Sequence, residues 1–158
     1  MEGALRSALE LKVPPPVVAL ILAVAMWFAS SYGPALDVPV FVRVASGIVI
    51  ALLGGVISIA GTVSFRMAKT TVNPMKPEKT SSLVTSGVYR FTRNPMYLGM
   101  FLVLVGWAAY LCSPWSLAGP VLFFAYIGRF QIAPEERVLS GMFGEAYVAY
   151  CEKVRRWL

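Results

Sequence analysis

A short stretch of the chain combines two arginines with an asparagine and a tyrosine. Arg90 and Arg93 lie just before Asn94-Pro95, and Tyr97 follows where the sequence becomes strongly apolar. A guanidinium can bind an anion, an amide can donate and accept hydrogen bonds, and an aromatic ring can pack on a cation. Ordinary membrane roles compete: headgroup anchoring by arginine, a helix start at Asn-Pro, and an interfacial tyrosine. Taken alone, the stretch leaves both interpretations open.

Two adjacent glutamates, Glu135 and Glu136, form the second group that could do chemistry. They follow Pro134 in the first turn of a predicted helix, where the helix dipole favours negative charge. Glu135 lies on the apolar stripe of that helix, so we expect it to face inward, where a carboxylate requires a positive partner. Either an arginine or a cationic ligand would supply that charge, unless both glutamates only satisfy helix amides. The candidate arginines are Arg90, Arg93 and Arg129.

The composition places these groups in a membrane protein. Hydrophobic residues make up 58% of the chain and charged residues 14%, against about 25% charged residues in soluble proteins. A soluble protein of this size could not bury so much apolar surface, so its solvent is lipid. Charge-free stretches and a break at Pro114 predict an all-α integral membrane fold with four transmembrane helices. The expected spans are about 15–35, 43–65, 95–112 and 115–131 within one membrane domain, 1–158.

The distribution of positive charge predicts the orientation. All lysines and arginines except Arg43 fall on one side of the expected spans, and that side is cytoplasmic by the positive-inside rule. We therefore expect a multi-pass protein with both termini in the cytoplasm, of a bacterial or archaeal inner membrane. An endoplasmic reticulum protein would have the same pattern.

Two segments outside the expected spans have internal structure. The cytoplasmic loop 66–94 contains apolar residues that we expect to be buried, and 134–151 has the periodicity of an amphipathic helix. A stripe of small residues on the second span predicts close helix packing. The buried loop residues are expected to be Leu83, Val84, Val88, Tyr89 and Phe91, and the stripe is Gly47, Ala51, Gly55, Ser58 and Thr62.

Other kinds of site are not indicated. Cys112 and Cys151 fall on opposite sides of the expected membrane, so they predict neither a disulfide nor a metal site. The basic charge follows from the cytoplasmic bias, and no nucleic-acid or dinucleotide motif is present.

The two chemical groups belong to a longer pattern. SSLVTSGVYRFTRNPMYLG is followed some 35 residues later by EERVLSGMFGEAYVAY, a match that extends from Leu83 to Tyr150. The order L-V-T-x-G-x-Y, R-[HN]-P-x-Y-x-G, E-E-x-x-L and F-G-x-x-Y-x-x-Y resembles the integral-membrane methyltransferases of the isoprenylcysteine carboxyl methyltransferase and phospholipid methyltransferase superfamily. Those enzymes use S-adenosylmethionine, so the resemblance implies this cofactor.

The resemblance also implies roles for individual residues. Arg93 and Asn94 are the candidate catalytic residues, and Arg129 and Gln131 are the candidate acceptor-binding residues, since the prenylcysteine branch has a basic residue about one turn before E-E. The implied cofactor-binding set is Ser81, Ser82, Leu83, Val84, Tyr89, Asn94, Pro95, Met96, Tyr97, Glu135 and Glu136.

Asn94 departs from the family pattern, which most often has histidine there. The chain contains no histidine, and asparagine does not titrate, so histidine is not the general base of any catalysis here. Methyl transfer from a sulfonium chiefly needs alignment and exclusion of water, and an ionised acceptor needs no base. This favours an anionic, lipophilic acceptor, such as a carboxylate of a prenylcysteine-like group.

Two other functions remain as alternatives. The replacement at Asn94 would also suit a catalytically inactive membrane scaffold of the same fold. A small four-helix transporter depends on an ionisable residue within the membrane, and the expected spans have no charge in their cores. Binding of S-adenosylhomocysteine separates an enzyme from a scaffold.

Overall fold

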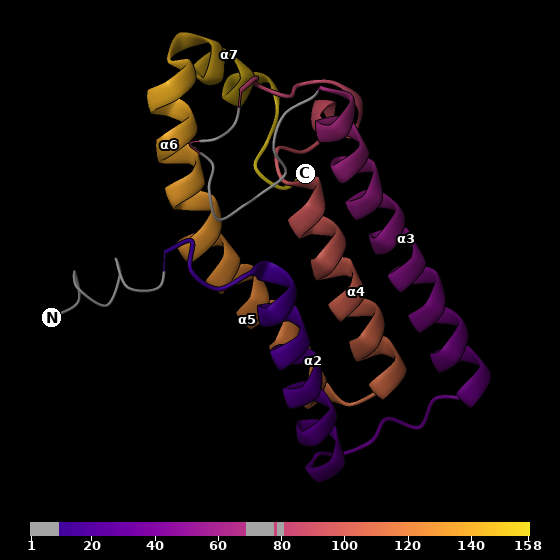
Figure 1. Ribbon diagram of the computed structural model, residues 1–158. Coiled ribbons are helices and arrows are strands. Elements are labelled where there is room, and N and C mark those ends of the chain that lie inside the picture. The colour runs from indigo at the N-terminus through magenta and orange to yellow at the C-terminus, as the bar shows by residue number, and fades with distance from the viewer. Residues whose placement is uncertain (1–9, 69–77, 79–80) are drawn as a thin grey trace, which may run out of the picture.

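The computed structural model describes residues 10–68, 78 and 81–158, and all regular structure within them is helical (Figure 1). Two long helices come first, α2 (Pro15–Tyr32) and α3 (Val40–Met67), followed by the short η2 (Gly87–Arg90) and then α4 (Pro95–Leu111). The chain ends with η3 (Pro114–Leu117), α5 (Ala118–Ile127), the π-helical turn η4 (Gly128–Ile132), α6 (Ala133–Phe143) and α7 (Glu145–Lys153).

The helices have the length and composition of a membrane protein. Within the described residues, three are long and apolar enough to cross a bilayer: Pro15–Tyr32, Val40–Met67 and the continuous helical stretch Pro114–Phe143. The helix α4 is apolar but has 17 residues, about 25 Å at 1.5 Å per residue, slightly less than a hydrocarbon core. The predicted all-α membrane fold is confirmed, while the count of four spans stays a prediction.

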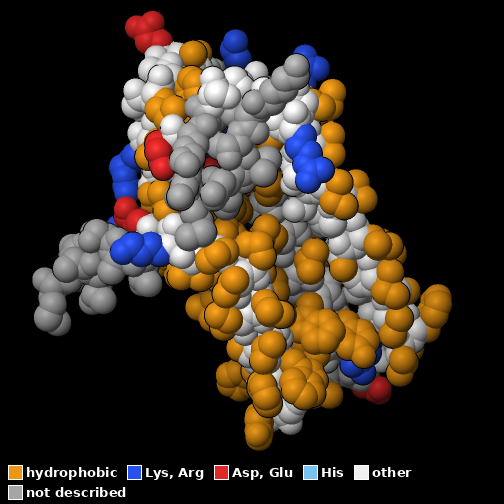
Figure 2. Space-filling view, viewed as in Figure 1, with side chains coloured by type: hydrophobic (Ala, Val, Ile, Leu, Met, Phe, Trp, Pro, Cys, Tyr) orange, Lys and Arg blue, Asp and Glu red, His pale blue; other side chains and the backbone are white. Residues whose placement is uncertain are grey.

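Side-chain types separate along the molecule (Figure 2). Hydrophobic side chains cover the visible surface of the lower half, whereas most visible charged side chains gather at the end that contains α6 and α7. Lipid-facing residues of α3, such as Leu52 and Val56, are more than 60% exposed, as expected when lipid is the solvent. We call the charged end the α6–α7 end.

The helices α3 and α4 approach so closely that only glycine fits between their backbones. A Cβ added to Gly54 would lie 2.5 Å from the carbonyl oxygen of Gly99, and one added to Gly99 would lie 2.4 Å from that of Gly54. The predicted small-residue stripe has the right role but is wrong at Gly55, where an added Cβ meets no atom within 4 Å. Contacts recur every seven residues, through Gly47, Gly54 and Gly61, because this spacing stays on one face of a helix packed at a small angle against its antiparallel partner.

The chain turns sharply after α4 and then continues as one helical stretch. Cys112 adopts a left-handed backbone conformation with φ 53°, and Pro114 begins η3, so the predicted break between 112 and 115 is observed. The helix α6 begins at Ala133, one residue before the predicted start at Pro134, but it continues directly from α5 through η4, which the sequence did not predict. In η4 the Ala133 N–H donates to the Gly128 carbonyl. This wider turn allows the helix to continue although Pro134 has no backbone N–H to donate.

The expected amphipathic helix over 134–151 is also divided. It breaks at Gly144, whose φ of 49° and ψ of −126° are accessible only to glycine at low cost, so α7 changes direction and returns toward α4 (Figure 1). In the loop before α4, Val84 and Tyr89 are buried as expected, but Phe91 is 72% exposed. Most of the earlier loop, residues 69–77 and 79–80, lies outside the described residues.

Candidate functional site

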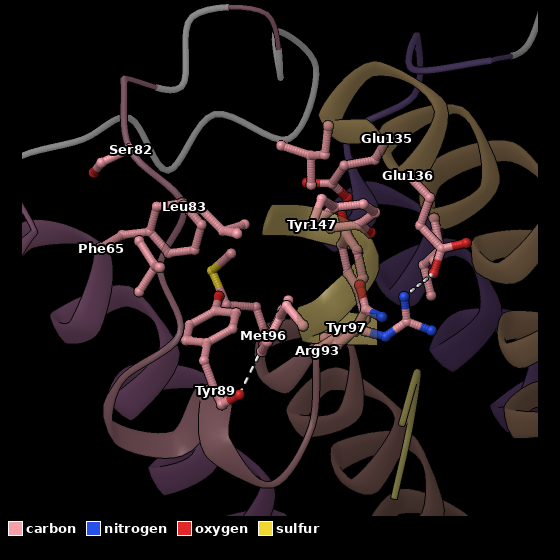
Figure 3. Close-up of a pocket in the computed structure, with 15 residues that line it drawn as sticks. Phe65, Ser82, Leu83, Tyr89, Arg93, Met96, Tyr97, Glu135, Glu136 and Tyr147 are labelled. Atoms are coloured by element: carbon pink, nitrogen blue, oxygen red, sulfur yellow. Dashed lines mark hydrogen bonds and ion pairs between the residues drawn. The ribbon is translucent and has the colours of Figure 1, made fainter. Parts of the chain in front are cut away.

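A cavity at the α6–α7 end is enclosed by segments far apart in the sequence (Figure 3). The stretch 82–84 and η2 form one side, the start of α4 forms the floor, and α6 and α7 form the other side. Its wall combines apolar and aromatic side chains with one arginine and two glutamates. The described lining residues are Phe65, Ser82, Leu83, Val84, Tyr89, Arg93, Asn94, Met96, Tyr97, Ile132, Glu135, Glu136, Leu139, Tyr147 and Tyr150.

Most residues of the predicted site meet at this cavity, including both candidate catalytic residues, Arg93 and Asn94. Two of the implied cofactor-binding residues do not line it. Pro95 is buried at the start of α4, near α3 at Gly61, and Ser81 is exposed. The implied residues that line the cavity are Ser82, Leu83, Val84, Tyr89, Asn94, Met96, Tyr97, Glu135 and Glu136.

The two candidate acceptor-binding residues lie elsewhere. Arg129 forms an ion pair with Glu10 at 3.3 Å, and the buried Gln131 donates from Nε2 to the Val13 carbonyl at 2.7 Å. Both residues belong to η4, whose side chains meet the segment that precedes α2. The structure therefore does not bring the predicted acceptor residues to the cavity.

Several lining residues were missed by the sequence analysis. The phenol of Tyr150 donates to the Tyr89 carbonyl at 2.7 Å and so fixes α7 against η2. The ring of Phe65, at the end of α3, packs edge-on against the Tyr89 ring with a centroid separation of 5.3 Å. Tyr147 and Tyr150 are the tyrosines of the F-G-x-x-Y-x-x-Y motif, so their spacing could have indicated a role in the site. Ile132 and Leu139 are apolar residues without any such signal.

Glu135 carries a carboxylate without a basic partner among the described residues. Its Oε2 accepts a hydrogen bond from the Tyr97 phenol at 3.1 Å, and Tyr97 is only 3% exposed. Of the arginines considered from the sequence, Arg93 pairs with Glu136 and Arg129 with Glu10, and Arg90 is exposed. Among the described residues, Glu135 therefore has a hydrogen-bond donor and no cationic partner.

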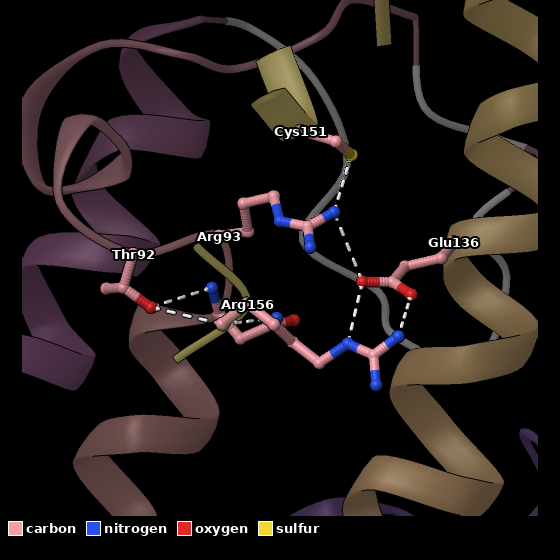
Figure 4. A network of polar contacts seen from close by, with 6 residues as sticks. Thr92, Arg93, Glu136, Cys151 and Arg156 are labelled. Atoms are coloured by element: carbon pink, nitrogen blue, oxygen red, sulfur yellow. Dashed lines mark hydrogen bonds and ion pairs between the residues drawn. The ribbon is translucent and has the colours of Figure 1, made fainter. Parts of the chain in front are cut away.

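Glu136, one residue further, is held by two arginines (Figure 4). The Arg93 Nη1 lies 3.3 Å from its Oε1, and Arg156 donates to both of its oxygens, from Nε at 3.0 Å and from Nη2. Arg93 also donates to the Cys151 thiol. The hydrogen bond to Glu136 is the main reason why the pKa of Arg156 is raised above its ordinary value. Among the described residues, Glu136 therefore has two cationic partners and its neighbour Glu135 has none.

The aromatic side chains of the wall remain uncharged. Burial, with a smaller contribution from the nearby Glu135, raises the pKa of Tyr89 well above its ordinary value. Burial also raises the pKa of Tyr147 and Tyr150. These phenols stay protonated at neutral pH, so they can act as hydrogen-bond donors or as uncharged surfaces for a planar or cationic group.

Asn94 has a structural contact that the sequence did not predict. It occupies the N-cap position of α4, but its side chain does not cap the helix. Instead, its Nδ2 donates to the Arg156 carbonyl at 2.8 Å. The amide is therefore engaged in holding the segment that follows α7.

The wall fits the charges and rings of S-adenosylmethionine. This cofactor carries an ammonium, a sulfonium, a carboxylate and an adenine, to which an unpaired glutamate, an arginine and uncharged aromatic rings are complementary. The enclosed volume is about 60 Å³, so binding of a nucleoside requires the walls to move apart. Within the described residues, no three or more histidine, cysteine, aspartate or glutamate side chains lie together as metal ligands would.

Comparisons with known proteins agree on one family. The sequence profile of the phospholipid methyltransferase family matches residues 42–146. Protein-S-isoprenylcysteine O-methyltransferase A of Arabidopsis thaliana is 33% identical over 111 residues, which cover 68% of this chain and 55% of the plant protein. The Xenopus laevis protein-S-isoprenylcysteine O-methyltransferase is 42% identical over 79 residues, covering 49% of this chain and 27% of that protein.

A shorter bacterial relative has no stated function. This uncharacterized protein of Haemophilus influenzae is 43% identical over 63 residues, which cover 40% of this chain and the whole relative. The chain spans about half the length of the plant relatives that it matches. No solved structure gave a significant match.

Proposed function

Because the chain belongs to the phospholipid methyltransferase family, we propose that it is an integral-membrane methyltransferase that uses S-adenosylmethionine and acts on a lipophilic acceptor. The observation that carries the proposal is Glu135, a carboxylate at the cavity wall with a tyrosine donor and no described basic partner. In a cavity next to a membrane, such a group needs a cation, and the methyl donor has two. The names of the eukaryotic relatives support methyl transfer to oxygen.

The residues of the wall have distinct roles in this proposal. Glu135, oriented by Tyr97, would bind the ammonium of the donor, and Arg93 would bind its carboxylate. The ring of Tyr89 would pack on the adenine or the sulfonium. When bound, S-adenosylmethionine would supply an electrophilic methyl group, whose bond to the sulfonium breaks as the acceptor bonds to it, with S-adenosylhomocysteine as the leaving group. The protein contributes alignment and exclusion of water, for which no histidine is needed.

The surface of the spans supports a lipophilic acceptor. Two apolar grooves, of about 470 and 330 Å³, lie along α4 between residues of α2 and α3 and share Val103. The second groove reaches Gly99 and Met100 at the beginning of α4, one turn from Met96 in the cavity wall. An extended hydrocarbon chain suits such a groove, and its polar end would then lie near the cavity.

The acceptor class within this proposal is an anion such as the carboxylate of a prenylcysteine-like molecule. An ionised oxygen needs no general base, and the named eukaryotic relatives are O-methyltransferases. A phospholipid amine is the second acceptor class, because the matching family profile is named for phospholipid methylation.

Donor binding by the purified protein tests the proposal. Calorimetry with S-adenosylhomocysteine should give a saturable signal with the intact chain and a signal at least tenfold weaker with Glu135→Gln. Glu152→Gln is the matched control, because Glu152 is exposed on α7 and forms no ion pair among the described residues. Absence of binding by the intact protein would favour an inactive scaffold.

The acceptor requires a separate assay. Transfer of a labelled methyl group should be measured with a prenylcysteine analogue, with phospholipid vesicles that contain an amine headgroup, and with small thiols. Treatment with mild base then identifies the product, because mild base hydrolyses a methyl ester but not a methylated amine. Label confined to amines would contradict the anionic acceptor.

A further inference from the structure

The segment that follows α7 runs back to the start of α4 (Figure 1), and its Trp157 reaches α5. We call Val154–Trp157 the strap. Val154 is buried and extended, with φ −126° and ψ 128°, and the Trp157 ring stacks on Phe124 of α5 with a centroid separation of 4.7 Å. Its other neighbour is Phe101 of α4, at 6.5 Å. The strap is thus anchored by an aromatic residue outside the cavity.

Between Val154 and Trp157, the backbone carbonyls of the strap bind the residues just before α4. The Arg93 N–H donates to the Arg155 carbonyl at 3.0 Å, and the Asn94 side chain donates to the Arg156 carbonyl at 2.8 Å. The Thr92 hydroxyl also lies 3.4 Å from the Arg156 carbonyl, and Thr92 is 1% exposed. Two residues of the cavity wall, Arg93 and Asn94, are therefore positioned by the strap.

The side chain of Arg156 reaches the opposite wall, where it donates to both oxygens of Glu136 on α6 (Figure 4). A bidentate pair of this kind fixes direction as well as charge. With Arg93 on the other side, Glu136 has two guanidinium partners. The strap consequently joins the two walls of the cavity and balances the charge of Glu136.

We propose that the strap is a positioning element of the methyl-donor site and that Arg156 sets the charge of this site by neutralising Glu136. Glu135 is then the carboxylate left to the donor. The inference rests on the proposed function, since it assigns the cavity to a methyl donor. It goes beyond that function because the strap lies outside the matched family region, 42–146.

The charge of the donor itself provides the test. S-adenosylmethionine has a positive sulfonium, whereas S-adenosylhomocysteine has a neutral thioether and is otherwise almost identical. Arg156→Gln removes one positive charge beside the site, so it should favour the positively charged S-adenosylmethionine. The dissociation constant of S-adenosylhomocysteine divided by that of S-adenosylmethionine should therefore rise roughly three- to tenfold. A purely structural loss would weaken both ligands equally and leave the ratio unchanged.

Matched variants distinguish the possible causes. Lys153→Gln makes the same change of charge at an exposed residue that forms no ion pair among the described residues, so its ratio should equal that of the unaltered protein. Arg156→Lys keeps the charge but loses the bidentate geometry, so its ratio should also stay close to the original. Both ligands are measured by calorimetry on the full chain in detergent, with thermal unfolding as a check on folding.

Two outcomes would overturn the inference. An unchanged ratio in Arg156→Gln would show that Arg156 does not set the charge of the site, and an equal rise in Lys153→Gln would show an effect of net charge alone. Failure of the unaltered protein to bind either ligand would instead reject the proposed function, so the two failures are distinguishable.

Discussion

Glu135 and Glu136 are adjacent in sequence, yet a single step along α6 gives them different partners. Glu136 lies between Arg93 and Arg156, whereas Glu135 meets the Tyr97 phenol. A carboxylate that is already paired twice gains little from another cation, while an unpaired carboxylate in a partly buried wall gains much. This difference, rather than the presence of two acids, makes Glu135 the better candidate for binding the proposed donor.

Tyr97 should therefore matter for affinity more than for folding. Tyr97→Phe removes the hydroxyl that orients Glu135 and keeps the ring that fills the core, so we expect donor affinity to fall about three- to tenfold. The melting temperature should change little. Tyr126→Phe is the control, because Tyr126 lies on α5 beside an apolar groove and away from the cavity. Calorimetry with S-adenosylhomocysteine measures both variants, and equal affinities would contradict the role of Tyr97.

The site residues that belong to a sequence motif could be predicted, whereas most of those outside the motifs could not. The pattern around Arg93 and Tyr97 predicted one wall, and the pair Glu135-Glu136 predicted the opposite wall. The partner of each glutamate was not predictable, because Arg156 belongs to no motif and approaches only after the break at Gly144. Asn94 illustrates the same limit, since its amide contacts a backbone carbonyl 62 residues later in the chain.

At the scale of elements, the contact between α3 and α4 allows a sharp comparison of adjacent glycines. Gly54→Ala and Gly99→Ala place a methyl group against a backbone carbonyl, which neither helix can relieve without moving apart. We expect each to lower the free energy of unfolding by about 1–3 kcal/mol. Gly55→Ala points into open space and should leave stability unchanged or slightly raised. Unfolding in detergent measures all three, and equal effects of Gly54→Ala and Gly55→Ala would contradict the observed register.

Element boundaries depended on backbone conformations that periodicity does not reveal. Apolar residues recur at helical spacing through Gly144, so the sequence predicted one helix where α6 and α7 form two. Conversely, Pro134 is a common helix-starting residue, yet the π-helical turn at 128–132 lets the helix continue through it. In both cases the hydrophobic pattern was correct, and one residue with unusual backbone requirements decided the geometry.

At the scale of the whole molecule, the amino-acid composition predicted a membrane environment, because so large an apolar surface is incompatible with water as the solvent. The folded chain keeps many large apolar side chains exposed along α2 and α3, while polar contacts concentrate at the α6–α7 end. A membrane thus determines which end of the molecule can hold a charged, water-soluble donor. The cavity lies at this end, and the proposed lipophilic acceptor would approach it from the spans.

The orientation of this end across the membrane follows from charge and can be measured. Asp37 lies in the link between α2 and α3, and Lys153 ends α7 at the other end of the molecule. In a chain with Cys112→Ala and Cys151→Ala, we expect an impermeant maleimide to label Asp37→Cys in intact cells and Lys153→Cys only in inverted vesicles. Both should react after detergent is added, which controls for intrinsic reactivity. Labelling of Lys153→Cys in intact cells would place the cavity outside the cytoplasm, where a cytoplasmic methyl donor could not reach it.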